Sequence, residues 1–183
     1  MINLRSLWLI AALLGMTGVA NSAVLVTIKP VHSIVAAVTE GVAEPDLLLD
    51  GTVSPHLDRI KPSVLRSLRK ADLVIWVGEG IETFLTSAIA QLPESVQVIT
   101  LAESDLPTLL PLRDSHDHAH KNGDHNNKLD PHLWLDPVNA AAIADIVAER
   151  LAVLYPTERQ VFLENAKQFK SCLLYTSPSP RDS

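Results

Sequence analysis

The sequence predicts an α/β domain built on a parallel sheet of strand–helix units. Short apolar runs alternate with longer segments in which apolar residues recur every three or four positions, the spacing typical of amphipathic helices. Residues 73–77 are apolar without interruption, which predicts a strand buried on both faces, as in parallel sheets. The hydrophobic share of 47% in 183 residues suffices for one packed core.

Three strand–helix units and a fourth strand are expected before residue 102. Pro62 stands at the N-terminal edge of the second helix, where its missing N–H is tolerated, and Ser63 is a candidate cap. Alternation of this kind favours crossover connections and a parallel sheet. The expected elements are strands at 24–28, 45–51, 73–77 and 96–101, and helices at 31–42, 63–71 and 81–92.

The second half of the sequence predicts a long loop followed by two helices. Residues 102–129 lack apolar periodicity and are expected to form a surface loop. Residues 138–154 have a strong helical pattern, and a second helix is expected to open at Thr157. This pattern stops after Lys170, so we expect residues 171–183 to lack helical structure. Sequence foreign to the natural protein is the favoured explanation, and a disordered natural tail is the alternative.

The N-terminus has the pattern of a secretory signal peptide over residues 1–23. Arg5 precedes an apolar run at 7–16, which is too short to span a bilayer, and small residues follow it. We expect removal between Ala20 and Ala23, leaving a mature protein in the periplasm with no membrane insertion.

Charge and cysteine content exclude other classes of protein. The net charge of −6 and the scattered lysines and arginines provide no basic surface for nucleic acid. Cys172 is the only cysteine, so no disulfide framework exists. Because no cysteine stands at the end of the signal, a lipid anchor is not indicated.

Two histidines, His56 and His132, are the candidate metal ligands. Each stands beside prolines in a loop that follows a predicted strand, and ligands of parallel sheets bind beyond the carboxyl ends of strands. Around His132, Pro131 and Pro137 restrict the backbone and push the preceding aspartates toward extended geometry. Neutral imidazole is the commonest metal ligand, and a neighbouring carboxylate can orient it.

The remaining histidines have weaker signals. His32 follows the first strand and its Lys29-Pro30 turn and could approach the same crevice, but its flanks do not brace it as the prolines brace His132, so a structural role is expected. A histidine-rich loop at 114–126 is either an auxiliary collector of metal or a solvated acidic loop, because histidine enrichment fixes no geometry. Its four histidines are His116, His118, His120 and His125.

Four segments, in this order, resemble the periplasmic zinc-binding proteins of ABC metal importers. They are "TIKPVHSIVAAVTEGV", "DLLLDGTVSPHLDRIKPS", "ADLVIWVGEGIETFL" and "DPHLWLDP". The resemblance runs from about residue 24 to residue 170, and the acidic histidine-rich loop resembles that of the zinc branch. Asp58 departs from the family, which often has an aromatic residue there, and Pro55 replaces a glutamate found in some relatives.

This resemblance implies one lobe of a two-lobed solute-binding protein, followed by the start of a long interdomain helix. The N-terminal metal-binding lobe would span 24–157 and the helix would begin at 158–170, with the C-terminal lobe and its ligands missing. The implied function is capture of Zn²⁺ and its delivery to a membrane permease by a monomer that is not an enzyme. His56 and His132 would be the ligands contributed by this lobe.

Two alternatives stay open at the level of sequence. A manganese-binding member of the same family would take more oxygen ligands from the missing lobe. A zinc-dependent hydrolase would need a general base, for which Asp58 and Asp136 are candidates, but no H-E-x-x-H helix or nucleophile elbow accompanies them.

Overall fold

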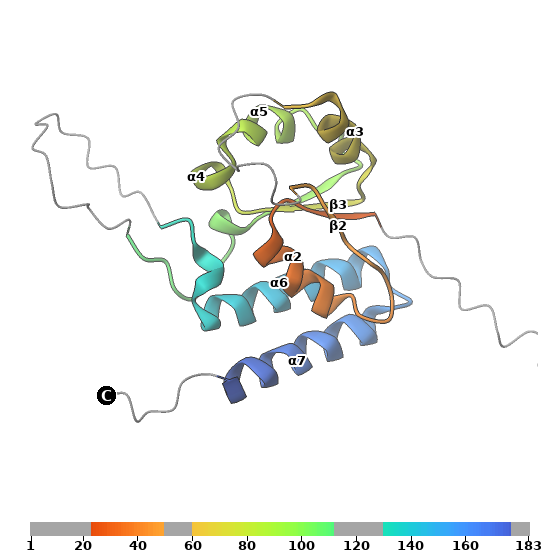
Figure 1. The fold of residues 1–183 in the computed structure, drawn as a ribbon. Helices are drawn as coiled ribbons and strands as arrows, with labels where there is room; N and C mark the ends of the chain where they lie inside the picture. Colours follow the sequence, from red (N-terminus) through yellow and green to blue (C-terminus); the bar gives the residue numbers. More distant parts are fainter. Residues whose placement is uncertain (1–22, 50–59, 112–129, 177–183) are drawn as a thin grey trace, which may run out of the picture.

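A four-stranded parallel sheet lies between two layers of helices (Figure 1). This computed structural model describes residues 23–49, 60–111 and 130–176. The strand order is β2-β1-β3-β4, and every neighbouring pair is parallel. The predicted parallel sheet is therefore confirmed. Its strands are β1 (Val24–Val26), β2 (Asp46–Leu47), β3 (Leu73–Trp76) and β4 (Gln97–Thr100).

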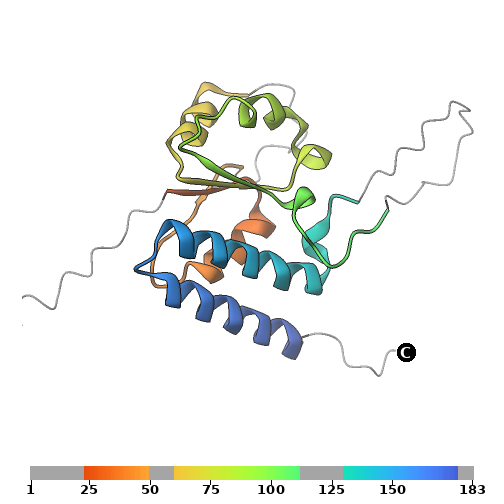
Figure 2. The same ribbon diagram turned by 180° about the vertical axis from the view of Figure 1, so that it is seen from behind.

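Both faces of the sheet are covered, which explains why β3 is apolar and buried throughout. Successive side chains of β3 alternate between two cores: Leu73 and Ile75 pack with α2, α6 and α7, whereas Val74 and Trp76 pack with α3 and α5. Figure 2 shows the same three layers from behind. The long helices are α2 (Lys29–Val38), α3 (Pro62–Lys70), α6 (Pro137–Leu154) and α7 (Arg159–Thr176).

Helix α6 begins at a well-capped N-terminus. The Oδ1 atom of Asp136 accepts hydrogen bonds from the backbone N–H groups of Val138 at 2.7 Å and Asn139 at 3.3 Å, and Pro137 occupies the first turn. Helix α7 returns antiparallel to α6 and packs along it (Figure 1).

The predicted helix at 81–92 was wrong as a single element. The chain forms three short pieces: α4 (Glu79–Glu82), a 3-10 turn η1 (Thr83–Leu85) and α5 (Thr86–Ile89). At Glu82 the backbone leaves helical geometry, with φ −107° and ψ 49°, while its side chain turns inward to accept backbone hydrogen bonds. That inward side chain and the break in the helix occur at the same residue.

Two other helix boundaries also differ from expectation. Ser63 does not cap α3; the residue before the helix is Lys61, whose side chain makes no capping bond. Helix α7 continues to Thr176, past Lys170, because α6 still supports it there. The Lys170 ammonium pairs with Asp145 of α6 at 2.7 Å, and Leu173 packs on the core.

Some sequence predictions concern residues outside the described ranges. These are the signal segment at 1–22, the segment 50–59 with His56, the histidine-rich loop and the last seven residues. Within the described ranges, no helix is both long and apolar enough to cross a bilayer.

Candidate metal centre

The candidate centre lies at the carboxyl edge of the sheet. After β1 the chain enters α2 on one face, and after β3 it enters α4 on the opposite face (Figure 1). The chain therefore diverges between the ends of two neighbouring strands, which is the point where ligands bind to parallel α/β sheets. Two groups stand there: the buried carboxyl of Glu82 and the segment that carries His132.

His132 is held by the aspartate two residues before it. The Oδ1 atom of Asp130 accepts hydrogen bonds from the ring Nδ1 of His132 at 2.7 Å and from its backbone N–H at 3.0 Å. Because an ionised carboxylate only accepts, Nδ1 carries the hydrogen, and in a neutral imidazole the lone pair then lies on Nε2. The imidazole thus presents an oriented nitrogen donor, as expected for a metal ligand.

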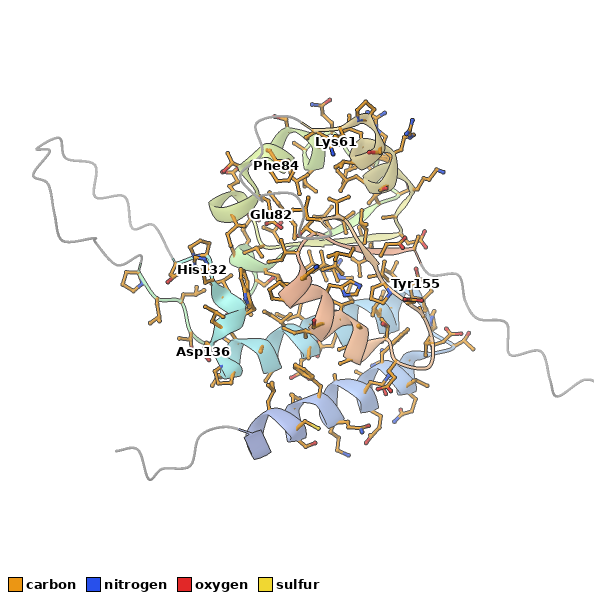
Figure 3. The ribbon with its side chains drawn as sticks, viewed as in Figure 1. Lys61, Glu82, Phe84, His132, Asp136 and Tyr155 are labelled. Carbon is orange, nitrogen blue, oxygen red and sulfur yellow. The ribbon has the colours of Figure 1, made fainter. Side chains whose placement is uncertain are left out.

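The His132 side chain is 55% exposed, and its ring also contacts Trp134 edge-on at 5.6 Å between centroids. Trp134 is half-buried and packs against the core next to the buried Leu133. The imidazole therefore contacts a side chain of the packed core while about half of its surface stays open to solvent. Figure 3 shows His132 and Asp136 together, far from Tyr155 at the other end of α6.

A cavity of about 340 Å³ opens beside His132. Its polar groups include two carboxylates, and its walls are otherwise mostly apolar. Asp136 uses its Oδ1 atom to cap α6, whereas Asp130 orients the imidazole. The lining residues of this His132 cavity are Thr108, Leu110, Asp130, His132, Leu133, Leu135, Asp136, Pro137 and Asn139.

Glu82 is a fully buried acid that the sequence prediction missed. It accepts hydrogen bonds from the backbone N–H groups of Val77 at 3.0 Å and Gly78 at 3.1 Å, and from the Thr27 hydroxyl. Burial raises the pKa of the Glu82 carboxyl, and this outweighs the three hydrogen bonds, which lower it. The only sequence signal is an acid within an apolar helical pattern just after a buried strand and a glycine.

Other predicted histidines divide into two groups. The ring Nε2 of His32 lies 2.8 Å from the carbonyl oxygen of Pro45, which agrees with the expected structural role. His56 and the four loop histidines lie outside the described residues. Leu49, the last described residue before the His56 segment, donates its N–H to Thr27 at the carboxyl edge. The chain therefore enters that segment from the edge where His132 also stands.

A complete metal site is not contained in the described ranges. Among residues 23–49, 60–111 and 130–176, no three His, Cys, Asp or Glu side chains come together to hold an ion. His132 offers one nitrogen, while zinc prefers four ligands. A zinc ion at His132 would therefore need further ligands from elsewhere in the protein.

Comparisons with known proteins agree with this architecture. A family model described as "ZnuA: Zinc-uptake complex component A periplasmic" matches residues 24–175. A high-affinity zinc uptake system protein ZnuA from Haemophilus ducreyi is 38% identical and covers 88% of this chain and 57% of that protein. The protein of the same name from Yersinia pestis is 33% identical, over 82% of this chain and 52% of its own length.

The chain spans about half the length of these relatives, and solved structures match it over a similar share. The Zn(II)-bound ZnuA-like domain of AdcA from Streptococcus pneumoniae has a TM-score of 0.68 at 22% identity, covering 85% of this chain and 53% of that chain. A Mn-bound periplasmic metal binding protein from Candidatus Liberibacter asiaticus has a TM-score of 0.67 at 17% identity, covering 83% and 53%. At such identities the likeness shows the fold alone.

Proposed function

Since the chain belongs to the ZnuA family of periplasmic zinc-uptake components, we propose that the whole protein captures Zn²⁺ in the periplasm and delivers it to an ABC-type permease. The observation that supports this best is the oriented imidazole of His132, whose Nδ1 is held by Asp130 while the side chain is 55% exposed. A ligand fixed in this way loses little freedom on binding metal.

His56 and His132 are the two zinc ligands that we assign to this part of the protein. Leu49, the last described residue before the His56 segment, donates its N–H to Thr27 at the carboxyl edge of the sheet, and the His132 segment lies at the same edge. Two imidazoles leave positions of a tetrahedral zinc ion open, so this chain alone should bind zinc weakly. The remaining ligands come, in our proposal, from a second lobe.

The division of the chain follows from the same proposal. Residues 24–157 form the N-terminal lobe, a signal peptide precedes it, and residues 158–170 are the start of a helix that leads to the second lobe. The histidine-rich loop at 114–126 serves as an auxiliary, loosely binding collector near the cleft. The mature protein acts as a monomer, and closure between its lobes adjusts release of the metal.

Zinc is favoured over manganese by donor chemistry. The described edge offers an oriented imidazole, and the Oδ1 atoms of the two carboxylates beside it already accept hydrogen bonds, whereas manganese prefers carboxylate, carbonyl and water oxygens. A hydrolase is disfavoured by Asp136, one of the two candidate bases, because its carboxylate already accepts two backbone hydrogen bonds at the start of α6. Reversible binding without turnover accounts for the whole arrangement.

Calorimetric titration of the chain with Zn²⁺ and with Mn²⁺ tests the proposal. Three variants accompany the native chain: the double substitution His56→Ala and His132→Ala, a deletion of residues 114–126, and His32→Ala. The last is a matched control, because His32 is a described histidine that bonds to Pro45 instead of lining the His132 cavity.

Zinc binding that is lost in the double variant and retained in both others is the expected result, with weaker binding of manganese. Binding that disappears only with the loop would contradict the assignment of His56 and His132. Equal affinity in the native chain and the double variant would do the same. A preference for manganese would overturn the choice of metal.

A further inference from the structure

A short turn after β3 is fixed to the sheet by one buried carboxyl group. Glu82, at the end of α4, accepts hydrogen bonds from Val77 and Gly78 at the end of β3 and from Thr27 at the end of β1. The turn therefore cannot shift relative to these strands without breaking buried hydrogen bonds. Gly78 has φ 133°, a conformation that residues with a side chain rarely adopt, so glycine is required where the turn begins.

This turn contacts the His132 segment at Gly80. A Cβ atom placed on Gly80 would lie 2.9 Å from Cβ and 3.4 Å from Cγ of Pro131. Non-bonded carbon atoms do not approach to 2.9 Å, and the proline ring cannot rotate away because it is closed onto its own backbone. Only glycine therefore fits at position 80 with Pro131 in its present place.

Pro131 lies directly between Asp130 and His132 in the chain. Asp130 holds both the ring and the backbone N–H of His132, so these residues form one small rigid unit. Buried Leu133 anchors the unit on its other side. A displacement of Pro131 would therefore move the imidazole relative to the sheet while leaving its bond to Asp130 intact.

We infer that Gly80 is a positioning residue of the zinc site, because its missing side chain seats Pro131 and thereby sets where the His132 imidazole stands. The inference rests on the proposed function, since it requires His132 to bind zinc. As a consequence, the turn that Glu82 fixes to the sheet also fixes the position of His132, which is distant in the sequence.

The test is a zinc titration of the full chain, monitored through the NMR signal of the His132 imidazole Cε1–H. This signal reports on His132 separately from the loop histidines. Gly80→Ala is expected to raise the Kd at His132 about tenfold, the lower end of the effect of outer-shell changes at metal sites. Gly41→Ala is the matched control, because Gly41 has φ 77° and nothing within 4 Å of its missing Cβ. It strains the backbone without touching the site, and its Kd should equal the native value.

A double-mutant cycle with Pro131→Gly makes the test specific. With Pro131 truncated, the added methyl group has no opposing atom, so Gly80→Ala should change the Kd by less than twofold in that background. If Gly80→Ala fails to fold, Pro131→Gly carries the test, and it must bind zinc more weakly than the native chain.

The possible failures are distinguishable. If zinc leaves the His132 signal of the native chain unchanged, the proposed function fails. If zinc binds at His132 but Gly80→Ala matches Gly41→Ala, or lowers affinity equally in both backgrounds of the cycle, the positioning role of Gly80 is overturned and the proposed function stands.

Discussion

The side-chain amide of Asn139 forms hydrogen bonds with both the N–H and the carbonyl oxygen of Thr108. Its Oδ1 atom accepts the Thr108 N–H at 2.9 Å, and its Nδ2 atom donates to the Thr108 carbonyl oxygen at 2.6 Å. Asn139 is buried in the first turn of α6, and both residues line the His132 cavity. This pair therefore holds the segment after β4 against the helix that begins beside His132.

Asn139→Ala is expected to lower the free energy of unfolding by about 1–3 kcal/mol, because it removes the buried amide that pairs with both half-buried backbone groups of Thr108. Chemical denaturation followed by circular dichroism measures the loss. Asn165→Ala is the matched control: its Nδ2 atom donates to the carbonyl oxygens of Val38 and Glu40, but Asn165 is only half-buried and water can replace it. Equal losses in the two variants would contradict the role of burial.

The interaction between Asp130 and His132 predicts the effect of a substitution that removes one charge. Asp130→Asn should weaken zinc binding about tenfold or more, because a neutral amide orients the imidazole and raises its basicity less than a carboxylate does. Asp136→Asn removes an identical charge from the same cavity, and asparagine caps helices as well as aspartate. Zinc titration of both variants should therefore show a larger loss for Asp130→Asn. Equal losses of zinc affinity in the two variants would mean that Asp130 acts only through its charge and not by orienting the imidazole.

Phe162 is the largest fully buried side chain that helix α7 contributes to the core. Phe162 is fully buried, whereas its neighbour Val161 is 42% exposed. Phe162→Ala should destabilise the protein by about 3–5 kcal/mol, the usual cost of removing a buried aromatic ring. Val161→Ala should change the stability by less than 1 kcal/mol. Thermal unfolding of both variants compares them, and similar melting temperatures would show that α7 is not docked through this ring.

The sheet was predictable from sequence because its strands carry a strong local signal. Residues 73–77 are apolar at every position, which distinguishes a strand covered on both faces from an amphipathic helix. The break in the helix at 81–92 was not predictable in this way. Apolar spacing does not reveal that the side chain of Glu82 turns inward toward Val77 and Gly78.

Only those features of the candidate site that depend on residues next to His132 in the sequence were predictable. Prolines and aspartates around His132 indicate a restrained imidazole, and Asp130 indeed holds the ring while Asp136 has the expected extended backbone. The contact of Gly80 with Pro131 and the pairing of Asn139 with Thr108 join residues far apart in the sequence. Such contacts follow from tertiary packing, which no local pattern encodes. The roles of His56 and of the loop histidines stay predictions.

Glu82 predicts an unusual dependence of stability on pH. Because burial raises the pKa of its carboxyl above the ordinary value, the folded protein holds this proton more tightly than the unfolded chain does. Between the unfolded and folded pKa values the folded state therefore binds more protons, and this group's contribution to stability falls as pH rises. Below the unfolded pKa the contribution is constant and fully present.

Glu82→Gln isolates this contribution, since glutamine can still accept a backbone N–H and bond to the Thr27 hydroxyl but carries no titrating proton. The stability of Glu82→Gln minus that of the native protein should increase as pH rises from 4 to 8, in urea denaturation at fixed ionic strength. Glu79→Gln, which removes an exposed carboxylate from the same turn, supplies the reference for loss of a surface charge. A stability difference for Glu82→Gln that stays constant or decreases over this range would show that burial does not raise the pKa of Glu82.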